Sequence, residues 1–148
     1  MEKFKIEDEW IIADPSELYW NKNEYLFQEE TRKIIGICME VHRILGRGFS
    51  EVVYKDAIQW EFEQKEVLFE REKEYIVKYK DTILKRTYIA DFVVFGNIIL
   101  EIKAQVGASE DNYSQVLNYL AVSKCPVGLL VNFGESSLKF KRFALTKS

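Results

Sequence analysis

Apolar residues recur at helical spacing in two stretches of the first half of the chain. From about Glu24 to Leu45 they return every three or four positions, which predicts one face of an amphipathic helix: Ile34, Ile37, Cys38, Val41, Ile44 and Leu45. Gly46 and Gly48 follow directly, and glycine favours the end of a helix. A second helix is predicted from the N-cap residue Ser50 to about Gln64, with one apolar face formed by Val53, Ala57 and Trp60.

Between Val67 and Lys103 the pattern changes to the alternation that is typical of strands. Strands are predicted at residues 67–70, 74–80, 83–95 and 98–103. Turns are predicted at Asp81-Thr82 and at Gly96-Asn97, since the Gly-Asn pair tolerates the positive φ values of a tight hairpin. Because the connections are short, these strands are expected to form an antiparallel meander.

The last third of the chain predicts a helix followed by a buried strand. Residues 109–123 form the helix, with Ser109 as the N-cap, and the apolar run from Gly128 to Gly134 resembles a strand buried on both faces. A strand, helix, strand succession of this length forms a right-handed crossover, which places the new strand parallel to its neighbour. Residues 138–144 are expected to add an edge strand. The predicted fold is α/β (α+β): a mixed central sheet, with an antiparallel meander plus one parallel strand, flanked by helices.

Charged residues interrupt the apolar strands of the meander. Glu101 and Lys103 lie two positions apart and share one face of their strand, while Ile102 points to the other face. Asp91 lies on the partner strand, and a hairpin closed near Gly96-Asn97 brings it level with a residue close to Lys103. Two carboxylates and an ammonium group then converge, and carboxylate oxygens are the ligands that hard cations such as magnesium prefer. The three residues form a candidate metal site in which the lysine orients a water molecule.

A simpler interpretation of the same residues competes with the metal site. Glu101 and Lys103 can form an ion pair on the solvated face of a strand, with Asp91 as a residue at a strand start. An Asp followed about ten residues later by Glu-x-Lys is frequent by chance, so spacing alone favours the ion pair.

Composition restricts the class of protein. A length of 148 residues suits a single domain, which we place at residues 24–148. Residues 1–23 are interpreted as an acidic N-terminal extension of that domain. Cys38 and Cys125 lack the spacing of a metal site, and two distant thiols suit a reducing compartment. The chain begins without an apolar signal segment and no run reaches membrane-spanning length. A cytoplasmic protein with no membrane partner is therefore expected.

The charge is unevenly distributed. The net charge of −3 argues at first against a nucleic-acid partner, because phosphate binding depends on Lys and Arg. Residues 1–30 hold nine acidic and three basic side chains, a balance of −6, which leaves 15 acids and 18 bases, or +3, in the rest. Three roles stay open for the acidic extension: shielding of the basic body as a phosphate mimic, a dimerisation strand in a homodimer, or simple packing.

Taken together, the motifs resemble a known family. The order helix, meander, helix, strand, with Asp91 and Glu101-Ile102-Lys103 in the meander, resembles the core of the PD-(D/E)XK nuclease superfamily. The segment Gly48-Phe49-Ser50-Glu51-Val52-Val53-Tyr54 is similar to the signature of the GxxExxY protein family, a nuclease-like branch of that superfamily. The resemblance covers roughly residues 31–142, with further agreement at 90–94, 101–104, 115–120 and 128–134. Ala90 stands where the superfamily name has proline.

The resemblance implies a reaction and its cofactor. It implies hydrolysis of phosphodiester bonds in nucleic acid, either DNA or RNA, with Mg²⁺ as cofactor and Mn²⁺ as a substitute. Asp91 and Glu101 correspond to the metal ligands of the superfamily, together with the backbone carbonyl of Ile102. Lys103 corresponds to the group that positions the attacking water.

The same resemblance assigns residues on two helices. Glu51 corresponds to an acidic residue that some branches supply from the first core helix, and Gln115 corresponds to the helix that flanks the site. Tyr54 and Tyr119 lie one helical turn from these residues and are expected to support them. The alternative function is a catalytically silent nuclease-fold module that binds a protein or nucleic acid as an adaptor.

Overall fold

The structure is a computed structural model, and it describes residues 2–6, 11–12, 27–107 and 110–147. The Ser109 cap, the predicted first turn before Phe27 and most of the acidic extension lie outside these residues. The helices are α1 (Gln28–Leu45), α2 (Glu51–Gln64) and α3 (Glu110–Ser123). The strands are β1 (Glu2–Ile6), β2 (Ile11–Ile12), β3 (Phe69–Tyr79), β4 (Thr82–Val94), β5 (Ile98–Lys103), β6 (Val127–Asn132) and β7 (Lys139–Lys147).

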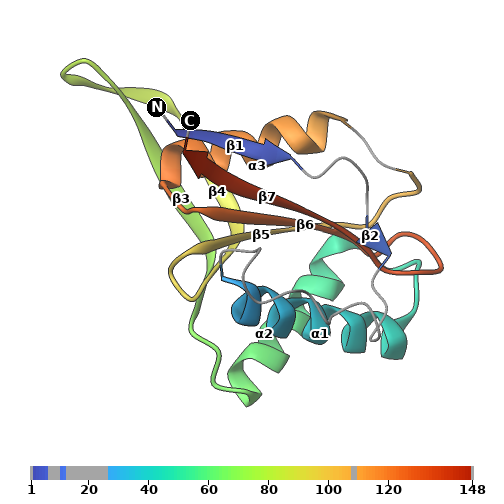
Figure 1. Ribbon diagram of the computed structural model, residues 1–148. Coiled ribbons are helices and arrows are strands. Elements are labelled where there is room, and N and C mark those ends of the chain that lie inside the picture. Colours follow the sequence, from blue (N-terminus) through green and yellow to red (C-terminus); the bar gives the residue numbers. More distant parts are fainter. Residues whose placement is uncertain (1, 7–10, 13–26, 108–109, 148) are drawn as a thin grey trace.

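A mixed sheet forms the central layer of the molecule, and helices cover both of its faces. The strand order is β1-β7-β6-β5-β4-β3, and β2 also pairs with β7. Helices α1 and α2 lie on one face and α3 lies on the other (Figure 1). The antiparallel meander β3-β4-β5 and the parallel pairing of β5 with β6 across α3 confirm the predicted fold class.

The helix ends follow the predicted signals, but the buried face of α2 does not. Gly46 has φ 70°, and its N–H donates to the His42 carbonyl at the end of α1. The predicted apolar face Val53, Ala57 and Trp60 is not the main packing face of α2: Ala57 packs partly against the core, but Trp60 is 58% exposed. The buried face is the alternative stripe Tyr54, Ile58 and Phe62. Both sets of residues have helical spacing. The set with the larger side chains, Tyr54, Ile58 and Phe62, packs inward, and the Tyr54 hydroxyl donates to the Gly46 carbonyl.

Two strand predictions are corrected by the sheet. The segments predicted at 67–70 and 74–80 belong to one continuous strand, β3, which pairs with β4 along most of its length. The last strand, β7, is not an edge strand, because β1 and β2 pair antiparallel with its outer side while β6 pairs with its inner side. An N-terminal segment whose strand propensity was obscured by its charges thus completes the sheet.

Two apolar clusters hold the layers together, one on each face of the sheet. The larger cluster joins α1 and α2 to inward-facing residues of β4, β5 and β6, among them Phe92, Leu100 and Leu129. The smaller cluster packs Val116 and Leu120 of α3 against the opposite face. No helix among the described residues combines the length and apolar character needed to cross a bilayer.

Candidate functional site

Asp91 and Glu101 lie side by side at the point where the pairing of β4 with β5 ends. The Asp91 amide donates a hydrogen bond of 2.8 Å to Glu101 Oε1, and the Ile102 amide donates one of 2.8 Å to Asp91 Oδ2. These side chains continue the link between the two strands after the backbone ladder has stopped. Each carboxylate is therefore fixed in place by a backbone N–H of the neighbouring strand.

The register of the hairpin differs slightly from the predicted one. The last ladder partners are Phe92 and Leu100, so continuing the same register brings Asp91 level with Glu101. The predicted turn at Gly96-Asn97 placed Asp91 level with a residue closer to Lys103. That turn position is wrong by one residue: the positive φ values belong to Phe95 (55°) and Gly96 (71°), and the Asn97 amide donates to the Val94 carbonyl. Lys103 still lies on the same strand face as Glu101, and its charge acts on that carboxyl group. The structure thus brings Asp91 and Glu101 together, with Lys103 on the same face of β5 as Glu101.

Glu101 is a buried acid whose surroundings disfavour its charge. The residue is 3% exposed. Burial raises the pKa of the Glu101 carboxyl well above its usual range, and the negative charge of Asp91 raises it further. The hydrogen bond from the Asp91 amide and the Lys103 ammonium act in the opposite direction. A simple ion pair on a solvated strand is excluded, because Glu101 is buried.

Lys55 of α2 is a site residue that the sequence interpretation missed. Its Nζ lies 3.0 Å from Asp91 Oδ1 and 3.4 Å from Glu72 Oε1, and its side chain is 11% exposed. Burial alone would lower the pKa of this ammonium, but the bonds and charges of Asp91 and Glu72 raise it above its ordinary value. The available signal was its position one turn after Glu51 and next to Tyr54, on the inner side of α2.

Glu72 is a second missed residue, and its backbone is unusual. It has φ 55°, in the left-handed region that costs a non-glycine residue roughly 1 kcal/mol. The β3–β4 ladder is interrupted between the partners Arg71↔Phe92 and Lys73↔Ala90, with Glu72 and Asp91 in the gap. This kink changes which face the strands present: Phe92 packs toward α1 and α2, whereas Ala90 packs toward α3. Such backbone strain is typical of functional positions.

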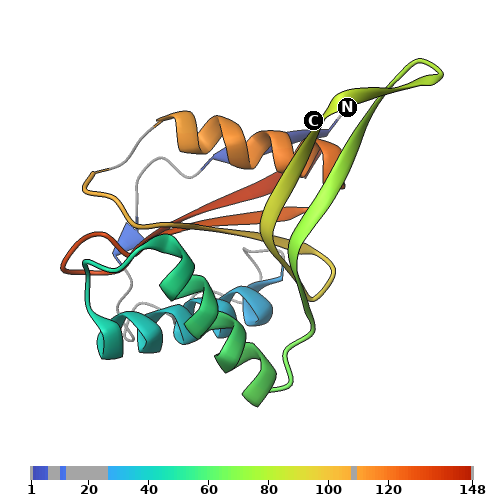
Figure 2. The same ribbon diagram turned by 180° about the vertical axis from the view of Figure 1, so that it is seen from behind.

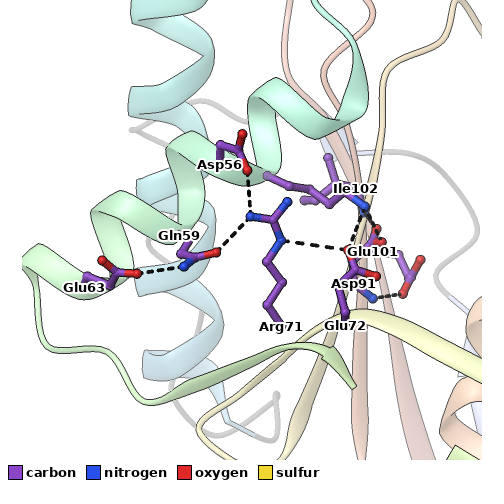
Figure 3. Close-up of polar contacts among 9 residues, drawn as sticks. Asp56, Gln59, Glu63, Arg71, Glu72, Asp91, Glu101 and Ile102 are labelled. Carbon is purple, nitrogen blue, oxygen red and sulfur yellow. Dashed lines mark hydrogen bonds and ion pairs between the residues drawn. The ribbon is translucent and has the colours of Figure 1, made fainter. Parts of the chain in front are cut away.

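Arg71 ties α2 to the kinked strands. Its Nη1 donates to Asp56 Oδ1 (2.7 Å) and to Gln59 Oε1 (2.8 Å), and Gln59 in turn donates to Glu63 (2.8 Å). Its Nε lies 3.9 Å from Glu72, so the network runs from α2 to the carboxylates of the site (Figure 3). These contacts fix the helix that carries Lys55 against the sheet.

Tyr119 and Gln115 bring α3 to the opposite side of the site. Burial, together with the charges of Glu101 and Asp91, raises the pKa of Tyr119, while a hydrogen bond with Gln115 acts in the opposite direction. The Tyr119 ring also packs edge-on against Tyr88, with centroids 5.8 Å apart. Tyr119 therefore lies within reach of the carboxylate charges, and Gln115 is joined to it by a hydrogen bond.

Glu51 and Tyr54 differ in their relation to the site. Glu51 is partly exposed in the first turn of α2, one turn before Lys55, and among the described residues it has no hydrogen bond or ion pair with Asp91 or Glu101. Tyr54 is fully buried and stacks on Phe133, with ring centroids 4.6 Å apart. Its hydroxyl donates to the Gly46 carbonyl (2.6 Å), so it supports the loop that leads into α2.

The donor set is suited to a hard divalent cation. Asp91 and Glu101 supply carboxylate oxygens, and such cations are commonly held by one or two carboxylates with water and substrate oxygens. A cation would also remove the repulsion that raises the pKa of Glu101. Among the described residues, no three or more His, Cys, Asp or Glu side chains are arranged around a common metal position. Lys55 supplies the positive charge beside Asp91 in this structure.

Comparisons with known proteins agree with this geometry. The model of the PD-(D/E)XK nuclease superfamily matches residues 28–143. The crystal structure of SSO0001 superposes with a TM-score of 0.50 at 17% sequence identity, over 78% of this chain and 58% of that one. At this identity the similarity concerns the fold. Among curated proteins no match was found.

Proposed function

Because the chain belongs to the PD-(D/E)XK nuclease superfamily, we propose that it is a metal-dependent nuclease that hydrolyses phosphodiester bonds of nucleic acid. The observation that carries this proposal is the reciprocal bonding of Asp91 and Glu101, which fixes two carboxylates side by side. We further propose membership of the GxxExxY branch. The motif supports this, because its Glu51 lies one turn from the site residue Lys55 and its Tyr54 braces the loop after α1.

Asp91 and Glu101 would hold the cation, with the Ile102 carbonyl as a further oxygen ligand and with Mg²⁺ or Mn²⁺ as the ion. A bound divalent ion supplies charge stabilisation at the scissile phosphate and lowers the pKa of a coordinated water. The backbone N–H groups of Asp91 and Ile102 orient the carboxylates, so the ligand oxygens are positioned before the substrate arrives.

Lys103 would position the attacking water, since it lies on the Glu101 face of β5 and its ammonium can donate to a water held there. Glu51 would act from the first turn of α2 and Gln115 from α3, on either side of the carboxylates. The protonated Tyr119 hydroxyl would donate a hydrogen bond to substrate oxygens or to Gln115. These roles divide the site into ligands on the sheet and orienting groups on the helices.

A cleavage assay tests this function. Single- and double-stranded DNA and RNA are incubated with the full chain in Mg²⁺, in Mn²⁺ and in EDTA, and products are resolved by length. Asp91→Ala and Lys103→Ala proteins are expected to lose cleavage, whereas the exposed α1 substitutions Glu40→Gln and Lys33→Ala serve as matched controls. Cleavage that persists in both site variants would reject the assignment.

A catalytically silent binding module is the second candidate, and one contact favours it. The Lys55 ammonium lies 3.0 Å from Asp91 and 3.4 Å from Glu72, so a protein cation already compensates the acidic cluster without a metal. This function predicts stable binding of a partner or nucleic acid with no cleavage in either metal. The assay above, repeated with a binding measurement on the same substrates, separates the two functions.

A further inference from the structure

The β3–β4 hairpin extends beyond the body of the sheet as a two-stranded arm. β5 pairs with β4 only from Phe92 to Val94, so the hairpin continues past the kink without a third strand. We define the arm as residues 76–89. It projects away from the other strands in both views (Figures 1 and 2). Residues 78–86, at its outer end, are all exposed.

The arm is basic although the whole chain is acidic. It contains one acidic residue, Asp81, and four basic residues: Lys78, Lys80, Lys85 and Arg86. Its balance is therefore +3, against −3 for the whole chain, which leaves −6 elsewhere. Within the described part of the chain none of these four cations forms an ion pair, and Lys80 lies over the Tyr79 ring at 5.5 Å. Unpaired cations on a projecting element are available to an anionic partner.

The arm also exposes apolar side chains. Ile76, Tyr79 and Ile83 are 47%, 59% and 61% exposed. Because these side chains are exposed on a two-stranded arm that no third strand covers, they do not contribute to a buried core. Apolar and aromatic side chains interleaved with cations are typical of surfaces that contact bases as well as phosphates.

The base of the arm leads to the candidate site. Arg86 and Tyr88 line an open pocket of about 520 Å³ together with Gln115, Asn118 and Tyr119 of α3. Asp91 follows Arg86 by five residues along β4, which corresponds to about 17 Å at the rise of an extended strand. The arm therefore leads to Gln115 and Tyr119 of α3, and Tyr119 lies near enough to the site for the charges of Glu101 and Asp91 to act on its hydroxyl.

We propose that the arm binds double-stranded DNA by entering its major groove and guides the duplex to Asp91 and Glu101. The major groove, about 12 Å wide, admits a two-stranded β-ribbon and has phosphates along both flanks. The arm carries cations on both of its strands, which matches a groove with anionic walls on either side. This inference rests on the proposed nuclease function and names its substrate class.

A second copy of this chain that paired arm to arm fits less well, because two arms of +3 would repel each other. Single-stranded nucleic acid and duplex RNA share the phosphate charge but differ in groove shape, since the major groove of A-form RNA is too narrow for side chains to read. The experiment distinguishes these occupants.

Binding is measured in EDTA, so that it does not depend on cleavage. The full chain is titrated into a fluorescent 30-base-pair DNA duplex at several salt concentrations, and competition uses single-stranded DNA and duplex RNA of the same length. The variant replaces Lys78, Lys80 and Lys85 by Gln. The control replaces three exposed cations of the α1 and α2 layer, Lys33, Arg43 and Lys65, by Gln and so has the same net charge.

The arm variant is expected to bind the duplex at least tenfold more weakly, and the slope of log K against log salt is expected to fall by up to about 2.7, or 0.9 for each lost phosphate contact. The control is expected to change affinity less than threefold. Thermal melting of each protein verifies that it is folded, and substitution at exposed positions leaves the core intact.

Equal losses in the arm variant and the control would overturn the proposal, because net charge would then explain the binding. It would also be overturned by stronger competition from single-stranded DNA or duplex RNA, by an arm variant that alters only dimerisation in sedimentation, or by no duplex binding at low salt. If duplex binding depends on the arm but no metal supports cleavage, the nuclease function fails and the DNA-binding surface stands.

Discussion

The Asp91 and Glu101 carboxylates each accept a hydrogen bond from a backbone amide of the opposite strand. The Asp91 amide donates to Glu101 Oε1, and the Ile102 amide donates to Asp91 Oδ2. This exchange occurs where the backbone ladder stops, so the site and the end of the β4–β5 pairing are one feature. Changes to the site are therefore expected to alter stability as well as activity.

Replacement of Lys55 by Met is expected to destabilise the metal-free protein by about 2 kcal/mol, because Asp91 and Glu72 lose their charged donor. Added Mg²⁺ or Mn²⁺ is expected to raise the melting temperature more in this variant than in the native chain, since no ammonium then competes for Asp91. The exposed Lys65→Met substitution is the control. Identical metal-induced shifts in the native and Lys55→Met proteins would contradict a shared cation position.

Because of Glu101, we expect the free energy of unfolding of the metal-free protein, measured in EDTA, to fall as pH rises. The pKa of its carboxyl is raised in the folded state, so the folded protein binds the proton more tightly than the unfolded chain does. The free energy of unfolding contributed by this group should decrease as pH rises from the ordinary carboxyl pKa of 4.5 to the raised value, and stay constant above it. Glu101→Gln should lack this decrease, measured by urea denaturation across pH.

The dependence of stability on pH is controlled by substitution of an exposed glutamate. Glu40→Gln, on α1, should leave the slope of stability against pH as it is in the native chain. A Glu101→Gln protein with the native slope would show that another group titrates. Saturating Mg²⁺ should reduce the slope in the native protein, because a cation favours the ionised carboxylate.

Tyr54→Phe is expected to cost about 1–3 kcal/mol of stability, because it removes one buried hydroxyl that serves two backbone groups. The hydroxyl donates to the Gly46 carbonyl at 2.6 Å and accepts from the Phe49 amide at 3.3 Å. Tyr79→Phe, at an exposed position of the arm, should change stability by less than about 0.5 kcal/mol. Denaturant titration of both variants checks the difference.

Gly134→Ala and Gly36→Ala are expected to act in opposite directions. A Cβ at Gly134 would lie 2.3 Å from backbone atoms of Gln105, which cannot move without disturbing the segment after Lys103. The substitution should destabilise the fold by about 3 kcal/mol or more. Gly36 is inside α1, where a Cβ meets nothing within 4 Å, so alanine should stabilise by roughly 0.5–1 kcal/mol. Melting curves in which both variants are destabilised equally would contradict this reasoning.

Local signals were sufficient for the three helices and for strands β4 to β6, but not for the continuous strand β3 or for β1 and β2. Gly46 ends α1 with φ 70° and Gly96 has φ 71° in the β4–β5 turn, conformations that glycine permits, whereas Ser50 occupies the N-cap position of α2 without a side-chain capping hydrogen bond. Periodicity was insufficient for α2, because two stripes of equal spacing competed and only the packing against Phe133 and Phe92 selected the one with Tyr54 and Phe62.

The sequence by itself determined the candidate carboxylates, since strand alternation places Glu101 and Lys103 on one face and a turn near Gly96 returns the chain from Asp91. Only the tertiary structure decided what surrounds them. Lys55 and Glu72 are 36 and 19 residues from Asp91 in the chain, and their approach depends on how α2 docks and on the left-handed backbone at Glu72. Local patterns follow from the backbone geometry of neighbouring residues, whereas an ion pair between distant elements exists only after the layers have packed.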